Sequence, residues 1–439
     1  MNFNESLEYL YGLGNEVSTM KLGLENITKL LATLGNPQNN YLKVQVAGTN
    51  GKGSTCAFLD AICVSANIKT GLYTSPHLVS ITERIKIGGA EISEKDFAKY
   101  ATKVREISEQ LVEVGELEFV PTFFEQVTAI ALSVFAEAKI ELAILETGLG
   151  GRFDATTAAK AEIVAITPID YDHQEILGET LTEIAAEKAA IIREDTKVIV
   201  APQNREAEKV ILEKCREVGV TAILATTEII VKKNELKKSE FLISADFKTA
   251  NSSYQNVVSG LNGKHQLTNA SLAISIAETL QNFNFKISNE NITFGLKNAR
   301  HKGRLEFCDG IWFDGAHNVA GAKALKEFLD EFIKQPITMI FGAMREKDLA
   351  EMAEILFPKA AKLILTEPKN PRSMKTEDLV KFVPTNFDEK NVFLAETVQA
   401  ALKLAKEISA AENLICVTGS LYLVGEAQKL LNNKSGTKN

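Results

Sequence analysis

The segment that most constrains the fold of this chain is glycine-rich and lies between a predicted strand and a predicted helix. Leu42 to Val46 is a short apolar run typical of a buried strand, and residues 54–66 have the apolar spacing of a helix. Glycines allow backbone conformations in which successive N–H groups converge at the positive end of a helix. The connecting segment therefore predicts a phosphate-binding loop, with the sequence Gly48-Thr49-Asn50-Gly51-Lys52-Gly53-Ser54.

This loop departs in two places from the common pattern G-x-x-x-x-G-K-[ST]. Val46 stands where the first glycine is expected, and Gly53 separates Lys52 from the hydroxyl of Ser54. A plain glycine-rich turn is the alternative interpretation. The order of strand, turn, lysine and helix favours phosphate binding.

Composition sets the broad class of the protein. A length of 439 residues predicts two or three domains, and the apolar (45%) and charged (24%) fractions are those of ordinary soluble proteins. The net charge of −8 argues against non-specific binding to nucleic acid or to acidic membranes. The five cysteines show no metal-ligand spacing, and we expect buried thiols in a reducing cytoplasm. The chain contains no basic-then-apolar leader and no apolar run of about 18 residues, so we expect a cytoplasmic protein without a membrane partner.

Polar residues follow the ends of several further predicted strands. Ser75 follows the strand 70–73, Glu146 follows the strand 142–145, and Asp170, Asp172 and His173 follow the strand 163–166. Predicted helices separate these strands, which is typical of a parallel sheet, and ligands bind such sheets at the carboxyl ends of the strands. We therefore expect these side chains to lie near the phosphate-binding loop. The predicted helices cover residues 94–114, 122–138, 181–192 and 265–283, and one more follows the strand 198–201 and ends at Val218.

The second half of the chain predicts a small antiparallel sheet and then a second α/β series. Residues 229–247 alternate apolar and polar around Asn234-Glu235, which we interpret as a turn between antiparallel strands. Glycines and a basic cluster between Phe294 and Arg304 suggest a domain boundary, and we divide the chain into residues 1–297 and 298–439. Residues 432–439 are expected to be a frayed tail.

Several polar groups have two interpretations from chemistry alone. Glu146 and the Asp170–His173 segment offer ligands for Mg²⁺, or they merely terminate strands. Lys188 occupies a helix with an apolar face, which by itself predicts a surface lysine. Arg304 belongs to a basic cluster that either reaches phosphate or carboxylate across a cleft or is a solvated charge run. All five histidines lie in dense polar clusters, unlike typical isolated histidines: His77, His173, His265, His301 and His317.

Motifs in a fixed order along the whole chain carry a specific resemblance to a known family. The chain resembles the folylpolyglutamate synthase/dihydrofolate synthase family, which belongs to the Mur-ligase-like ATP-dependent amide ligases. The glycine after Lys52 is a feature of this family's loop. The motifs are the loop 48–54, Tyr73-Thr74-Ser75-Pro76-His77-Leu78, the run 146–156, Asp172-His173 with Leu177-Gly178, Glu187-Lys188-Ala189, His265-Gln266, Asp314-Gly315-Ala316-His317-Asn318 and the run 418–423.

The resemblance implies a fold and a set of site residues. The expected fold is an N-terminal P-loop ATPase domain, with a mainly parallel sheet plus a small antiparallel sheet, followed by a C-terminal Rossmann-like glutamate ligase domain. The expected small-molecule ligands are ATP with Mg²⁺, at one or two metal sites. By matching position, the expected catalytic residues are Lys52, Lys188 as a carbamate, and His317; the nucleotide residues are Asn50, Gly51, Lys52, Gly53, Ser54, Asn269, Arg304 and Asp314; the metal ligands are Ser75, Glu146 and His173; and the pterin contacts are Phe124, Arg152 and Phe153.

The resemblance also implies the reaction, in which ATP converts a folate carboxylate into an acyl phosphate that the amine of L-glutamate attacks. It leaves open whether dihydropteroate, reduced folates or both are acceptors. A ligase of cell-wall precursors would share this chemistry, and a P-loop switch is a third hypothesis. The His265-Gln266 and Ser75-Pro76-His77 patterns favour folate, and the chain lacks the guanine-reading Asn-Lys-x-Asp of a switch. We expect a monomer.

Overall fold

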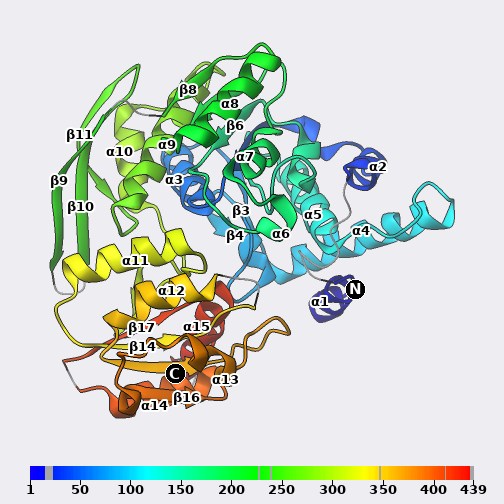
Figure 1. Cartoon of the computed structure of the whole chain (residues 1–439). Helices are drawn as coiled ribbons and strands as arrows, with labels where there is room; N and C mark the ends of the chain where they lie inside the picture. The colour runs from blue at the N-terminus through cyan, green and yellow to red at the C-terminus, as the bar shows by residue number, and fades with distance from the viewer. Residues whose placement is uncertain (15–22, 226–227, 238–239, 346–347, 411, 436–439) are drawn as a thin grey trace.

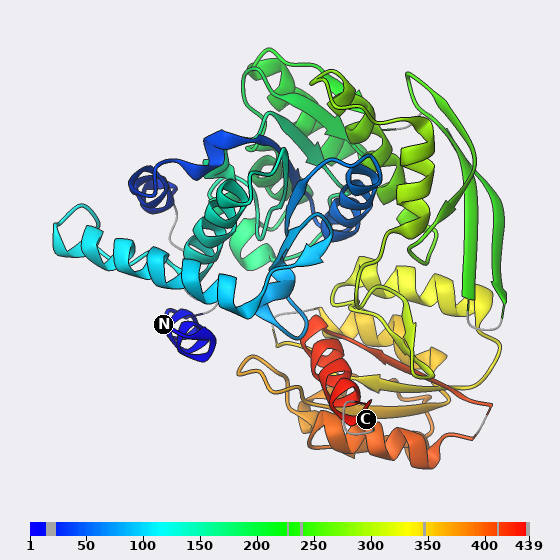
Figure 2. The ribbon, with the colours of Figure 1, turned by 180° about the vertical axis from the view of Figure 1, so that it is seen from behind.

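The chain folds into two α/β domains, each built on its own sheet, with a small antiparallel sheet beside them. The computed structural model describes residues 1–439 except 15–22, 226–227, 238–239, 346–347, 411 and 436–439. Figure 1 shows the N-terminal domain, blue to green, above the C-terminal domain, yellow to red. The view from behind in Figure 2 shows the small sheet running along one side toward α11 of the C-terminal domain. The expected fold class is confirmed.

The N-terminal domain is organised by an eight-stranded sheet with the order β4-β3-β2-β5-β1-β6-β7-β8. The short β3 and β4 are antiparallel additions at one edge, and the other six strands are parallel. The strands are β1 (Leu42–Ala47), β2 (Thr70–Tyr73), β3 (Ile85–Ile87), β4 (Ala90–Glu91), β5 (Leu142–Glu146), β6 (Ile163–Ile166), β7 (Lys197–Val200) and β8 (Ala222–Leu224).

Helices cover both faces of this sheet, so its strands are apolar on both sides. Val44 and Ile163 point toward the layer of α3, α9 and α10, whereas Val164 and Val198 point toward the layer that contains α7 and α8. The helices α1, α2, α4 and α5 pack on the part of the sheet that holds β2 and β5. These helices are α1 (Phe3–Gly12), α2 (Glu25–Thr33), α3 (Lys52–Ser65), α4 (Glu94–Glu113), α5 (Phe123–Glu137), α6 (Gln174–Leu177), α7 (Leu181–Ala189), α8 (Arg205–Glu217), α9 (His265–Gln281) and α10 (Asn289–Asn298).

The small sheet corrects the expected turn at Asn234-Glu235. Its strands are β9 (Glu228–Lys237), β10 (Glu240–Lys248) and β11 (Ser253–Ser259), and Asn234 lies inside β9, paired with Ile243. A polar pair in an alternating run resembles a turn, but here backbone pairing with β10 keeps both residues in the strand although such residues are uncommon in strands. The actual connection includes residues 238–239, which lie outside the described residues.

Phe241 of β10 joins the small sheet to the C-terminal domain. Its ring centroid lies 5.3 Å from that of Phe328 and 4.8 Å from that of Phe332, both on α11. The two sequence-distant parts therefore share an apolar contact, and Figure 2 shows the small sheet and α11 side by side.

The C-terminal domain has a six-stranded sheet with the order β12-β13-β17-β14-β15-β16, in which only β12 is antiparallel to its neighbour. Helices α11 and α12 pack on one face, and α14 and α15 pack on the other. The strands are β12 (Glu306–Cys308), β13 (Ile311–Phe313), β14 (Ile337–Phe341), β15 (Lys362–Thr366), β16 (Val392–Ala395) and β17 (Leu414–Thr418); the helices are α11 (Val319–Phe332), α12 (Leu349–Leu356), α13 (Thr376–Leu379), α14 (Val398–Ile408) and α15 (Leu421–Ser435).

The C-terminal tail and one cysteine differ from the expectations, and the domain division is not tested. The predicted frayed tail is wrong for residues 432–435, which continue α15, and its last four residues lie outside the described part. Cys308 is exposed, against the expectation of buried thiols, whereas the other four cysteines are buried and all five are free. The division at residues 297/298 stays a prediction; α10 ends at Asn298 and β12 begins at Glu306. Among the described helices, none combines the length and apolar character required to cross a bilayer.

Candidate active site

The phosphate-binding loop, residues 48–54, connects β1 to α3 as the sequence predicts. Gly51 is the N-cap residue of α3 with a φ of 92°, a conformation that residues with a side chain rarely adopt. A Cβ atom at Gly51 would collide with Asn269, and one at Gly48 would collide with Thr167. The helix begins at Lys52, two residues before the predicted start, so the N–H groups of its first turn belong to the loop. This is the geometry that binds phosphate at a helix N-terminus.

Two lysines converge on the carbonyl group of Gly48. Lys52 Nζ donates to Gly48 O at 3.1 Å and to Thr49 O at 3.1 Å, and Lys188 Nζ donates to Gly48 O at 2.9 Å. Lys188 comes from α7 and is 4% exposed, so the interpretation as a surface lysine is wrong. Burial, reinforced by the Lys52 charge, lowers the pKa of Lys188 to about 7.

Glu146 and Ser75 lie together at the carboxyl ends of adjacent parallel strands. The β2–β5 pairing aligns Tyr73 with Leu145, and Ser75 N donates to Glu146 Oε2 at 3.0 Å. Glu146 is 5% exposed, and burial raises the pKa of its carboxyl group although Lys52 opposes the shift. A buried carboxylate beside a hydroxyl fits a hard divalent cation, which would compensate the buried charge.

His173 reaches the same cavity from the loop after β6. It has a φ of 51° and precedes α6, and its backbone N–H donates to Asp172 Oδ1 at 3.0 Å. Among the described residues, no group of three or more His, Cys, Asp and Glu side chains has the arrangement of a metal site. The set of Ser75, Glu146 and His173, which includes a hydroxyl, stays a prediction.

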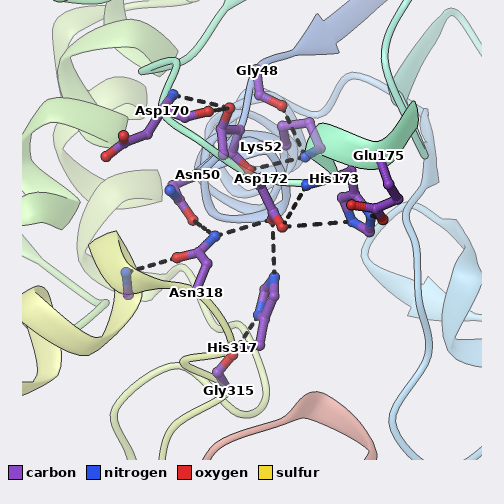
Figure 3. A network of polar contacts seen from close by, with 12 residues as sticks. Gly48, Asn50, Lys52, Asp170, Asp172, His173, Glu175, Gly315, His317 and Asn318 are labelled. Carbon is purple, nitrogen blue, oxygen red and sulfur yellow. Dashed lines mark hydrogen bonds and ion pairs between the residues drawn. The ribbon is translucent and has the colours of Figure 1, made fainter. Parts of the chain in front are cut away.

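The C-terminal domain contributes the segment that follows β13. Asp314 is buried and accepts from Leu305 N at 3.0 Å and Ala316 N at 2.9 Å, which holds the segment in a tight turn. Burial raises the pKa of Asp314, and Arg304 opposes that shift. Figure 3 shows His317 and Asn318 extending from this segment toward Asp172 of the N-terminal domain.

Two cavities meet at the phosphate-binding loop. One, of about 230 Å³, is lined by Lys52, Ser75, Glu146, His173, Lys188 and His317, together with Phe124 and Phe153. The other, of about 240 Å³, is lined by Ser54, Asn269, Asp314 and the first turns of α11. Asn50, Gly51 and Arg304 line both cavities.

Most of the predicted site residues are therefore brought together, and Arg152 is the exception. Its Nε donates to Glu187 Oε1 at 2.8 Å, and its side chain does not line either cavity although its neighbour Phe153 does. The basic cluster before the second domain also contains one residue that lines the cavities and one that does not. Arg304 faces the cavities, whereas Lys302 lies 3.2 Å from Glu91 and 3.5 Å from Glu83 at the surface.

The histidine clusters serve different purposes. Burial lowers the pKa of His77 to about 3, of His265 to about 4 and of His301 to about 3, so these three are neutral at physiological pH. Two of them have polar partners: Arg84 Nε donates to His77 Nδ1 at 2.8 Å, and the Gln266 amide lies 3.1 Å from His265 Nε2. His173 and His317 are the two histidines that line the first cavity.

Comparison with known proteins places this geometry in a family. The Mur ligase middle domain matches residues 46–277, and the Mur ligase glutamate ligase domain matches residues 303–421. A Bacillus subtilis protein named dihydrofolate synthase/folylpolyglutamate synthase is 34% identical over 421 residues, which cover 94% of this chain and 95% of that protein. The chain belongs to the folylpolyglutamate synthase/dihydrofolate synthase family of Mur ligases.

Solved structures of this family share the whole fold. Mycobacterium tuberculosis folylpolyglutamate synthase complexed with ADP has a TM-score of 0.89 at 28% identity, covering 98% of this chain and 99% of that one. E. coli FolC in complex with DHPP and ADP has a TM-score of 0.86 at 27% identity, covering 99% of each chain. A Haloferax volcanii relative named probable bifunctional folylpolyglutamate synthase/dihydropteroate synthase is longer, and this chain spans 50% of it.

Some residues of the site were not singled out from the sequence. The sequence pattern predicts that the amide of Asn318 points toward an edge of the C-terminal domain but indicates no partner for it, and it indicates no role for Arg372 or Tyr422. Arg372 and Tyr422 line the first cavity from the C-terminal domain, where Arg372 Nη2 donates to Tyr422 Oη at 3.1 Å. They are 50 residues apart in sequence, and neither follows a glycine-rich turn that would mark it. The tertiary fold alone brings them to the site.

Proposed function

We propose that this protein is an ATP-dependent ligase that adds L-glutamate to a folate, and also to dihydropteroate. The observation that carries the proposal is the convergence of the phosphate-binding loop and the Asp314–Asn318 segment on two connected cavities. Relatives that are similar over nearly the whole chain are named for both reactions. The solved complexes of the family hold ADP, AMPPCP and a manganese ion, which supports ATP and a divalent metal as the ligands.

The chemistry requires activation of a carboxylate, because its oxygen is a poor leaving group. A carboxylate oxygen of the acceptor attacks the γ-phosphorus of ATP, ADP departs, and an acyl phosphate results. The glutamate nitrogen then attacks the acyl carbon, phosphate leaves with the former carboxylate oxygen, and the nitrogen loses a proton as the amide forms. The loop N–H groups and Lys52 stabilise the charge on the transferred phosphoryl group.

The two cavities divide the substrates between them. The nucleotide base and ribose belong to the second cavity, with Asn269, Arg304 and Asp314, while its phosphates reach Asn50, Gly51, Gly53 and Ser54. The pterin belongs among the aromatic residues of the first cavity, Phe124 and Phe153. Arg152 stays a predicted contact, and its side chain would have to leave Glu187 to make it. His317 stands at the reacting end between them.

Mg²⁺ would be held by Ser75, Glu146 and His173, with Lys188 as a carbamate providing a further carboxylate-like group. When bound, the cation supplies charge neutralisation at the phosphates. The buried carboxylate of Glu146 fits this role, since an isolated buried charge is costly without a partner. Location in the cytoplasm and a monomeric state also stay our predictions.

The test is an assay of ADP formation with the purified protein, ATP, Mg²⁺ and L-glutamate, with dihydropteroate or a reduced folate as acceptor. We expect glutamate-dependent ADP release and a product heavier by one glutamyl residue with both acceptors. Absence of ADP and of product with both would refute the proposal. A product only with a UDP-linked muramyl substrate would assign the chain to cell-wall ligation.

Arg372 is our candidate for binding the α-carboxylate of the incoming glutamate. Its guanidinium group is held by Tyr422, with the Arg372 Cζ atom 5.7 Å from the ring centroid, and Arg372 lines the cavity that His317 also lines. A guanidinium group binds a carboxylate through two parallel hydrogen bonds. We expect Arg372→Ala to raise the KM for glutamate about 10–100-fold, with little change in the KM for ATP. Dihydropteroate is used as the acceptor in this assay because it carries no glutamyl group of its own, whose carboxylate could also bind Arg372.

The conservative variants sharpen this measurement. Arg372→Lys keeps the charge but loses the paired geometry, so its KM for glutamate should lie between those of the wild type and the alanine variant. Tyr422→Phe keeps the ring and removes the hydroxyl that holds the guanidinium group. An unchanged KM for glutamate in Arg372→Ala would exclude the assignment.

A further inference from the structure

One polar contact directly joins the C-terminal domain to the phosphate-binding loop. Asn318 Nδ2 donates to Asn50 Oδ1 at 3.1 Å and to Asp172 Oδ2 at 3.1 Å, so a single amide group spans three segments (Figure 3). Asn318 is 5% exposed, and the side chain of Asp172 is 10% exposed. We call these three residues the interdomain bridge.

The other end of the Asn318 amide fixes the helix that follows. Its Oδ1 accepts from Gly321 N at 2.9 Å and caps α11, whose first turns line the nucleotide cavity. One side chain therefore connects the N-terminus of α11 to the phosphate-binding loop. The distance between these two elements sets the width of the cavity that they line.

The bridge also lies beside the reacting groups. His317 Nε2 is 3.7 Å from Asp172 Oδ2, the oxygen that accepts from Asn318. The Asp172 carboxylate acts at longer range on Lys52 and Lys188, and raises the pKa of both against the effect of burial. A shift of Asn318 would therefore be felt at the loop, at Asp172 and at His317 together.

We propose that Asn318 is a positioning residue, which through the interdomain bridge holds the C-terminal domain and His317 in register with the phosphate-binding loop. The role rests on the proposed ligase function, because the register matters for the reaction between acyl phosphate and amine. A hydrogen bond to a buried carboxylate is strong enough to fix such a register. The Nδ2 atom of Asn318, which donates to Asn50 and Asp172, has the positioning role, and its Oδ1 atom caps α11.

The two roles can be separated because Asp is also a good N-cap residue. Asn318→Asp keeps the acceptor for Gly321 N but replaces the donor by a carboxylate that faces Asp172. Asp172→Asn keeps an oxygen for His173 N and presents a donor instead of an acceptor. The double variant exchanges the two groups, so a donor faces an acceptor again and the net charge is that of the wild type.

The experiment is a double-mutant cycle on glutamate-dependent ADP formation. We expect each single variant to lower kcat about 10–100-fold, the effect of losing one hydrogen bond to a charged group. The double variant should be at least about fivefold more active than the product of the two single losses predicts, since the bond is restored. The Asp172→Asn variant loses the bond to Asn318 together with any separate contribution of Asp172, and the coupling term of the cycle isolates the bond.

A matched control comes from another capping asparagine. Asn204 Oδ1 accepts from Glu206 N at 3.0 Å at the start of α8, away from both cavities. Asn204→Asp should leave both kcat and the thermal unfolding midpoint unchanged. Asn318→Asp buries a second carboxylate against Asp172 and should lower the midpoint, so kcat is compared at a temperature at which every variant is folded. A wild-type kcat in Asn318→Asp, or single losses that simply multiply in the double variant, would overturn the proposal.

A second readout keeps this test separate from the proposed function. Binding of ADP, measured by calorimetry, should weaken in Asn318→Asp, because a carboxylate then faces both Asp172 and Asn50. It should recover in part in the double variant, where the new amide at position 172 donates to that carboxylate while the contact with Asn50 stays lost. An inactive wild type that binds ADP would refute the ligase assignment. The same cycle in ADP affinity would still support or overturn the bridge.

Discussion

Lys52→Ala should lower kcat for glutamate-dependent ADP formation by about 10³-fold or more, while the protein stays folded. Lys52 Nζ sits on the carbonyl groups of Gly48 and Thr49 at the N-terminus of α3, where it is the mobile cation of the phosphate-binding loop. Without the Lys52 side chain, the N–H groups of the loop still bind phosphate, but no positive charge moves with the transferred phosphoryl group. The measurement is steady-state ADP release together with a thermal unfolding curve.

Lys43 provides a matched control for this loss. Lys43 is 4% exposed and lies on β1, the strand that leads into the loop. Its Nζ donates to Gln38 O at 3.0 Å and to Tyr41 O at 3.1 Å, and lies 3.0 Å from Glu162. Lys43→Met should lower the unfolding midpoint and leave the kcat of the folded protein near wild type. Lys52→Ala with a near-wild-type kcat would contradict the assignment of the loop.

The parallel strands and the motifs at their ends were predictable because both depend on local sequence. A buried parallel strand is a continuous apolar run, so residues 70–73 and 163–166 were predicted with the bounds that the structure has. The carboxyl ends of such strands meet at one edge, so Ser75, Glu146 and His173 could be grouped before their positions were known.

The features that the sequence did not predict depend on tertiary contacts or are too short to show a pattern. The short edge strands β3 and β4 contain three and two residues and carry no measurable period, and they were not predicted. Asn234 and Glu235 are polar but sit inside β9, since hydrogen bonding to β10 fixes the strand. Lys188 looked like a surface residue from its helix alone, because only the tertiary fold shows that its polar face is turned toward Gly48. Arg372 and Tyr422 depend on the same kind of information.

Burial of the Lys188 amine lowers the stability of the fold, whereas the proposed reaction requires this amine. The Lys188→Met variant tests both effects. The folded-state pKa of Lys188 is about 7, below its ordinary value of 10.5, because burial and Lys52 disfavour the charged form. Between these two values the unfolded chain binds more protons than the folded one, so stability rises with pH across this range. The buried amine is therefore most costly at pH 7 and below. Methionine fills a similar volume without a charge, and Lys188→Met should raise the unfolding midpoint at pH 6 more than at pH 9.

The same substitution should lower kcat by about 10²-fold or more. Carbamate formation requires a neutral amine, and methionine has no amine. In the proposed modification, the nitrogen of Lys188 would add to the carbon of CO₂ with release of a proton, which would place a carboxylate-like anion next to the proposed metal ligands. Wild-type activity should fall when CO₂ is removed and return with bicarbonate, and the mass of the intact protein should show the added CO₂. Lys188→Met should not respond to bicarbonate. A wild type that is equally active without CO₂ would leave Lys188 as an amine that contacts Gly48, and would rule out the carbamate.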